Sequence, residues 1–173
     1  ESAVDEINSV WIEGFFPARI DDLNSKMSQD KICSEVYLPR SAATITYSKV
    51  YPQLTNLTGI MDPDLTVSGN WNSGGKPSQW IQFNFAKKTY IQSIRLKAAN
   101  IPTQLVTLKV LYDLGPNTNN LTIQQSISVG QFIDIPFNKS IKDVRIITTE
   151  GDGWVAWNRV LFITGETCEC AEP

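Results

Sequence analysis

A turn-rich loop between Gly59 and Ser68 carries oxygen-bearing side chains at a spacing that could bind a metal ion. Asp62, Asp64 and Thr66 alternate along this loop. Hard cations such as Ca²⁺ take several oxygen ligands from carboxylates and carbonyl groups, so this loop suits calcium. The alternative is an Asx-type turn, in which the same side chains bond the backbone and no metal is present.

Two other loops combine aromatic rings with planar polar side chains. The first reads SGNWNSGGK and the second EGDGWVAWNR. A sugar presents apolar C–H faces edged with hydroxyl groups, and its recognition therefore needs an aromatic surface beside polar groups. Core packing is the alternative for each tryptophan, and the one beside two acids in the second loop is expected to be exposed. The predicted ligand contacts are Trp71, Asn72, Asp152, Trp154, Trp157, Asn158 and Arg159.

The sequence argues against an enzyme. It contains no histidine, which removes the usual general base and every Ser-His-Asp or Cys-His arrangement. Paired carboxylates remain an option, for example Asp62 with Asp64 or Glu150 with Asp152, but the members of each pair are close neighbours in one loop. The two carboxylates of a glycosidase face each other across a cleft, and these pairs do not indicate that geometry.

Short segments that alternate apolar and polar residues dominate the sequence after Cys33. In the segment 80–85, for example, Ile81, Phe83 and Phe85 alternate with Gln82 and Asn84, as in a half-buried strand. Turn signals separate the segments, and the pattern predicts an all-β sandwich of about eight strands. The predicted strands are 43–48, 80–85, 91–98, 105–112, 121–129, 131–137, 143–149 and 160–164.

The first part of the chain has a different pattern. Apolar residues from Ala3 to Trp11 recur at helical spacing, which predicts a short helical extension that packs on the sandwich or forms the end of a stalk. We expect this extension at residues 1–31, the sandwich at 32–167 and a C-terminal tail at 168–173. The chain begins at Glu1 without an initiator Met, so we also expect a fragment of a larger, multidomain or oligomeric protein.

The segment that joins the loops to the central strand resembles a known family. The dipeptide NW at Asn70–Trp71, about eight loop residues, then WIQFNF and YIQSIRL are similar to the discoidin (coagulation factor C-type) group. The likeness extends over residues 34–165. It implies a galactose-binding-like jelly-roll β-sandwich that binds a ligand through its end loops without transforming it.

The same resemblance implies a structural calcium ion bound by the loop before the central strand. Backbone carbonyls, an Asp and a Thr would hold it, often with a Glu near the last strand. The sequence departs from that pattern at the last strand, where Asn158 and Arg159 stand in place of the acid. An inward-facing Arg159 would repel a cation.

Discoidin-like domains commonly close with a disulfide, so the resemblance implies a bond between Cys33 and Cys168 or Cys170. The ends of compact domains often lie close together, which agrees with such a bond. We take Cys168 as the partner, and the leftover cysteine then indicates an intermolecular bond or a truncated partner in a secreted protein. Three reduced thiols or a thiolate metal site are the competing interpretations.

Charge and composition limit the possible partners. The net charge is −3 and the basic residues are scattered, which argues against nucleic acid. The negative charge also opposes insertion into an anionic membrane, for which the loop offers only Ile60, Met61 and Leu65. If the protein is secreted by a eukaryote, the three sequons are candidate glycosylation sites, at Asn56, Asn120 and Asn138.

These features together predict a non-catalytic module outside the cell or at its surface, with lectin-like binding of a glycan as the leading function. Protein–protein adhesion or receptor recognition, including the head of a viral or phage fibre, is the main alternative. Phospholipid binding ranks third.

Overall fold

The computed structural model describes residues 31–99 and 103–170, and these residues form eight β-strands. Three short 3-10 helices lie in the loops, at Arg40–Ala42, Pro52–Leu54 and Leu57–Gly59. Within the described residues, no helix is long and apolar enough to span a membrane. The strands are β1 (Lys31–Tyr37), β2 (Ala43–Tyr47), β3 (Trp71–Asn72), β4 (Gln79–Ala98), β5 (Gln104–Tyr112), β6 (Asn119–Ile127), β7 (Phe132–Glu150) and β8 (Ala156–Cys170).

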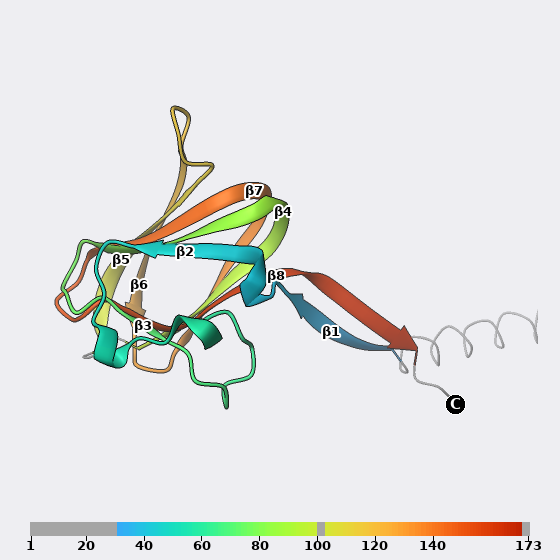
Figure 1. The fold of residues 1–173 in the computed structure, drawn as a ribbon, viewed down its shortest axis with the longest axis horizontal. Helices are drawn as coiled ribbons and strands as arrows, with labels where there is room; N and C mark the ends of the chain where they lie inside the picture. Colours follow the sequence, from blue (N-terminus) through green and yellow to red (C-terminus); the bar gives the residue numbers. More distant parts are fainter. Residues whose placement is uncertain (1–30, 100–102, 171–173) are drawn as a thin grey trace, which may run out of the picture. The chain divides into compact units, whose positions relative to one another are not determined.

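Two long strands, β4 and β7, run side by side and belong to both layers of the fold (Figure 1). In one layer, the segment of β4 from Gln79 to Asn84 pairs with β7. This layer also contains β2, which pairs with β4, and β5 and β6, of which β5 pairs with β7. Thr89 to Lys97 pairs with β7 in the other layer, where β8 joins β4 and is flanked by β1 and β3. The pairing register of β4 shifts between Asn84 and Thr89 and again between Ile91 and Ser93. Such bulges bend a strand, and β4 passes from one layer to the other at these positions.

The core lies between the layers and follows the predicted alternation. Ile81 and Phe83 are fully buried, whereas Gln82 on the opposite face is partly exposed. The rings of Phe83 and Phe85 pack edge-on against Phe162 of β8, with centroids 5.0 and 5.2 Å apart. Edge-to-face aromatic pairs add to the free energy that burial itself provides. The predicted all-β sandwich is confirmed.

Two strand predictions were wrong in extent. The segments 80–85 and 91–98 form the single strand β4, and the segments 131–137 and 143–149 form the single strand β7. Polar residues such as Lys87 and Lys88 interrupt the apolar pattern, yet backbone pairing continues through the bulges. The strand β1 was not predicted, because its side chains are exposed on both faces and show no alternation of burial.

The predicted domain boundaries stay a prediction. The helical extension lies outside the described residues, except for Lys31, which begins β1. The described residues divide into one compact unit at residues 35–165 and a second that includes residues 31–34 and 166–170. The ends of β1 and β8 belong to the second unit, so β structure continues past the expected edges of the sandwich.

The disulfide between Cys33 and Cys168 is present and closes a sequence separation of 135 residues. Glu166 lies near the two sulfur atoms, and these three residues form the one candidate metal cluster of His, Cys, Asp and Glu among the described residues. Because both cysteines are oxidised, they cannot act as the thiolate ligands of a metal. The predicted role of Cys170 stays a prediction.

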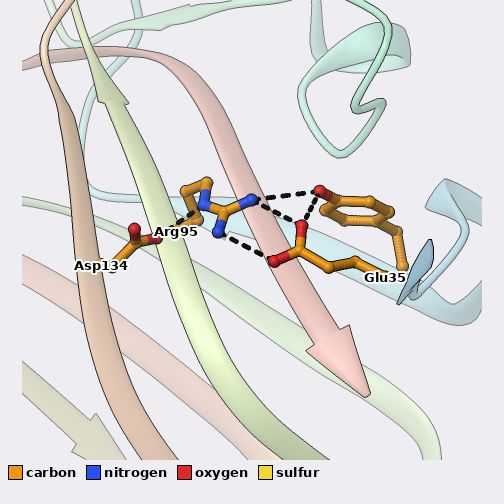
Figure 2. A network of polar contacts seen from close by, with 4 residues as sticks. Glu35, Arg95 and Asp134 are labelled. Carbon is orange, nitrogen blue, oxygen red and sulfur yellow. Dashed lines mark hydrogen bonds and ion pairs between the residues drawn. The ribbon is translucent and has the colours of Figure 1, made fainter. Parts of the chain in front are cut away.

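An ion-pair network on the outer face ties β1 to the rest of the fold (Figure 2). Both Nη atoms of Arg95 donate to the carboxylate of Glu35, at 2.7 and 3.0 Å, and its Nε donates to Asp134 at 2.6 Å. The tyrosine ring in Figure 2 is Tyr37, whose hydroxyl accepts from Arg95 Nη1. These contacts lower the pKa of Glu35. The hydrogen bonds from Arg95 have the largest effect, and the Tyr37 hydroxyl has the second largest.

Replacing Glu35 by Gln should therefore destabilise the protein in a pH-dependent way. A lowered pKa in the folded state means that the carboxylate stabilises the fold above its unfolded pKa of 4.5 and loses this effect as the pH falls through the lower, folded value. Because the pair is partly exposed, we expect a loss of about 1 kcal/mol at pH 7 in urea unfolding. The difference between variant and wild type should shrink at pH 3; a pH-independent difference would contradict the ionic origin.

Candidate ligand-binding site

A surface depression of about 380 Å³ brings two exposed aromatic rings together. It is lined by Tyr51, Leu54, Asn72, Gly74 and Trp154. The apolar side chains are open to solvent: the exposed fractions of Tyr51, Leu54 and Trp154 are 45%, 55% and 53%. Large apolar side chains exposed around one pocket indicate a binding surface rather than a packing fault. We call these five residues the aromatic pocket.

Backbone hydrogen bonds fix the Tyr51 side of the aromatic pocket on β3. Tyr51 N donates to Asn72 O at 2.8 Å, and Asn72 N donates to the hydroxyl of Thr55 at 3.0 Å. Gly74 has a φ of +66°, and a Cβ at this position would lie 3.1 Å from Cβ of Tyr51. A glycine is therefore needed for the backbone turn and lets the Tyr51 side chain pack closely.

The Trp154 side is fixed by a glutamine from β5 and by the first loop. Gln104 Oε1 accepts from the backbone N–H groups of Asp152 and Gly153. Val155 N donates to Gly75 O at 2.9 Å, and Ser73 N donates to Val155 O at 3.0 Å. The two loops predicted separately from the sequence are thus bonded to each other, and Trp154 lines the same depression as Asn72 and Tyr51.

Asn72 supplies a polar group to the aromatic pocket. Its Oδ1 accepts from Gly74 N at 2.8 Å, which fixes the orientation of the amide. The amide Nδ2 has no hydrogen-bond partner among the described residues and is thus able to donate to a ligand. None of the five lining side chains is charged. The pocket offers apolar faces and neutral polar groups.

The structure places three of the predicted ligand contacts in the interior. Trp71 and Trp157 are 0% and 2% exposed and face each other across the β3–β8 pair, while Trp71 Nε1 donates to Lys49 O. Arg159 is 3% exposed. The positions of Trp71 and Trp157 are a correction to the sequence-based set, because an aromatic ring buried against another strand presents no face to a ligand. Arg159 lines a depression together with Asn158. Local sequence alone does not separate an exposed loop tryptophan from one that begins a buried strand.

The remaining predicted contacts have different positions. Asn72 and Trp154 lie in the aromatic pocket. Asp152 is exposed beside that pocket without lining it, and Asn158 lines a separate depression with Lys97. Sequence reasoning missed Tyr51 and its neighbour Leu54. The available signal was a tyrosine followed directly by proline, in the loop after the strand at 43–48.

The loop predicted to hold calcium is closed tightly at its base. Asn56 and Asn70 pair through two backbone hydrogen bonds of 2.9 and 3.0 Å. A Cβ on Gly69 would lie 2.2 Å from the carbonyl carbon of Gly59, so only a glycine allows this approach. Ile60 is fully buried, and its carbonyl accepts from Val160 N of β8 at 2.8 Å.

The predicted calcium ligands bond the protein instead. Asp64 Oδ1 accepts from the backbone N–H and the hydroxyl of Thr66, at 2.9 and 2.7 Å. The Thr66 hydroxyl is the main cause that lowers the pKa of Asp64. Asp62 Oδ1 accepts from Asp64 N at 2.9 Å. This is the Asx-type turn of the alternative interpretation.

The loop carbonyls are also bonded, by the guanidinium of Arg159. Its Nε donates to Asp62 O at 2.8 Å, and its two Nη atoms donate to further backbone carbonyls of the loop, at Asp64, Val67 and Gly69. A calcium ion needs six to eight oxygen ligands free to surround it. Because a buried guanidinium already takes these oxygens, the loop does not fit calcium.

The three sequons lie at different positions. Asn120 in β6 and Asn138 at the middle of β7 are exposed. Asn56 accepts from Thr58 N as a helix cap and donates to Ser68 Oγ. Their glycosylation stays a prediction.

Replacing Gly69 by Ala should destabilise the loop base, because the added Cβ overlaps the Gly59 backbone. We expect a loss of about 2 kcal/mol in the free energy of unfolding, measured by urea denaturation. Gly165→Ala is the matched control, since a Cβ there meets no atom within 4 Å. Equal stability of both variants would show that the close approach at Gly69 does not constrain the fold.

No protein-family model and no curated protein matches the sequence. Solved structures do match in fold. The family 32 carbohydrate-binding module of Clostridium perfringens NanJ, solved with galactose, aligns over 75% of this chain and 99% of its own, with a TM-score of 0.58 and 11% identity. CpGH89CBM32-4 from the same organism, solved with GlcNAc-α-1,4-galactose, covers 75% and 96%, with a TM-score of 0.54 and 17% identity.

A third match is the family 32 module of AlyQ, in complex with 4,5-unsaturated mannuronic acid. It covers 69% of this chain and 92% of its own, with a TM-score of 0.53 and 14% identity. At these identities the likeness concerns the fold. The chain therefore has the galactose-binding-like jelly-roll fold that its resemblance to discoidin domains implied.

Proposed function

We propose that this chain is a non-catalytic, extracellular module that binds glycans through the aromatic pocket. The observation that carries the proposal is the pair of exposed rings, Tyr51 and Trp154, which line one depression together with Asn72. The jelly-roll neighbours named above are carbohydrate-binding modules, which supports the same class of ligand.

We propose that the aromatic pocket holds one hexose ring. An aromatic face packs against the axial C–H groups of a pyranose, and Leu54 adds a further apolar contact. The Asn72 amide and the Tyr51 hydroxyl then provide hydrogen bonds to the sugar hydroxyls. Because the lining is uncharged, the proposed ligand is a neutral sugar such as galactose or N-acetylgalactosamine, not a uronic or sialic acid.

A single shallow pocket binds a monosaccharide weakly, with a Kd on the order of millimolar. Useful affinity then requires several copies of the module, either in a larger multidomain chain or in an oligomer. We therefore propose that the chain acts as part of such an assembly at a glycan-covered surface.

The alternative is protein–protein adhesion or receptor recognition, including that by the head of a viral or phage fibre. The same exposed rings allow it, because aromatic side chains also anchor protein partners. Lipid insertion has less support. Of the three apolar residues that the loop offered, Ile60 and Met61 are 0% and 1% exposed, and only Leu65 reaches solvent, at 48%. Leu65 and Val67, the latter 39% exposed, provide too little apolar area to anchor a protein in a membrane.

A glycan array with the module displayed multivalently tests the proposal. Tyr51→Ala and Trp154→Ala should each reduce binding by about tenfold or more, because each removes a stacking face. Tyr90→Ala is the matched control, since Tyr90 is 48% exposed but does not line the aromatic pocket. Binding that survives both pocket substitutions would place the site elsewhere, and a blank array with a folded sample would favour a protein partner.

The charge of the ligand can be tested on the same array. Neutral galactose-containing glycans should bind better than uronic acid or sialylated glycans, because no cationic side chain lines the aromatic pocket. Binding should also change little between about 50 and 500 mM NaCl, since no ion pair is screened. A preference for acidic glycans with a steep loss of binding in salt would contradict the neutral-sugar assignment.

A further inference from the structure

We infer that Arg159 is a built-in cation that holds the loop from Asp62 to Gly69 in place of a calcium ion, so that the loop is ordered without any metal. The inference concerns the loop and not the aromatic pocket, and it holds whatever the pocket binds.

A guanidinium has five N–H donors, and each donor of Arg159 has one backbone carbonyl as its partner. Nε donates to Asp62 O at 2.8 Å. Nη1 donates to Gly69 O and, at 2.8 Å, to Asn158 O. Nη2 donates to Asp64 O at 3.2 Å and to Val67 O. Four of the five carbonyls belong to the loop, which is therefore wrapped around this one side chain.

Backbone carbonyls are the direct partners of the buried charge, and the Asp64 carboxylate acts on it only from a distance. Arg159 is 3% exposed and forms no salt bridge with a described residue. A buried cation needs such compensation, because its removal from water costs several kcal/mol. The acids in the loop are used otherwise: Asp64 Oδ1 accepts from Thr66 and Asp62 Oδ1 accepts from Asp64 N. A ring of inward-pointing carbonyls is also what a hard cation binds.

The arginine is held in place from the β8 side as well. Its own strand continues into Val160, whose N–H donates to Ile60 O just before the loop. The guanidinium therefore joins the strand to the loop at several points, as a metal ion bridging the two would do. A second cation cannot enter, because the oxygens already face the guanidinium and the two positive charges would repel each other.

The wild-type protein provides the first test. Its melting temperature should be the same, within about 1 °C, in 5 mM EDTA and in 5 mM CaCl₂, and calcium should produce no binding heat in titration calorimetry. A rise of several degrees with calcium would overturn the inference. Because these readouts need no glycan, failure here is distinguishable from failure of the proposed function.

The second test converts the loop to a calcium site. Arg159→Glu places a carboxylate among the five carbonyls. The carbonyl and carboxylate oxygens together number about six or seven, which is the number of oxygen ligands that Ca²⁺ requires. In EDTA this variant should melt at least about 5 °C below wild type, and millimolar CaCl₂ should restore part of the loss, while the same concentration of MgCl₂ should not. A folded variant that does not respond to calcium would contradict the inference.

Arg40→Glu is the matched control. Arg40 is also partly buried and donates to two backbone carbonyls, those of Leu57 and Ala43, but it lies outside the loop. This variant should lose stability and gain no calcium response. A calcium response equal to that of Arg159→Glu would show that added negative charge, and not the carbonyl ring, attracts the ion.

A third comparison applies if Arg159→Glu does not fold. Arg159→Lys keeps a cation with fewer donors, whereas Arg159→Met keeps a long apolar side chain without charge. If the loop needs a cation, the lysine variant should melt above the methionine variant, and both should remain insensitive to EDTA. Equal melting temperatures would overturn the role of the charge.

Discussion

The continuous pairing of β4 with β7 is the constraint on which the rest of the structure depends. These two strands exchange backbone hydrogen bonds in both layers of the sandwich and continue through bulges where they bend. The apolar face of β4, with Phe83 and Leu96 fully buried, therefore contributes to one core from both layers. A break in this ladder would separate the layers and expose that core to water, which costs far more free energy than any surface contact returns.

The loops at the ends of these strands gain their order in two different ways. Around the aromatic pocket, neutral hydrogen bonds from Gln104 and between the two loops hold Trp154 in an exposed position. In the loop from Asp62 to Gly69, a single buried cation does the same work for the backbone. In both arrangements, hydrogen bonds within the chain hold the loop backbone.

The sequence was informative where local periodicity and burial agree. The alternation of Ile81 and Phe83 with Gln82 predicted a half-buried strand and its inner face, and the NW…WIQFNF segment led to the right fold. The prediction failed where long-range contacts decide. Strand β1 has no buried face and so no alternation, and its pairing with β8 involves residues more than a hundred positions away. Trp71 and Trp157 looked like loop residues, but cross-strand packing buries them.

The site shows the same division. Trp154 and Asn72 could be named because their residue types suit sugars. For Tyr51 the tyrosine–proline pair marks a loop, but it does not reveal the backbone hydrogen bond to Asn72 that places Tyr51 in the pocket. Arg159 was recognised as unfavourable for calcium if it faced inward. That it takes the carbonyls itself follows only from the geometry of the folded loop.

Glycan binding at the aromatic pocket is tested most directly by NMR, through a titration of the isotope-labelled protein with galactose up to about 50 mM, well above a millimolar Kd. The indole N–H of Trp154 and the side-chain amide of Asn72 should show the largest chemical-shift changes, and both should saturate along one binding curve. Saturable shifts at other residues, or none at all for these two groups, would contradict a sugar site at this pocket.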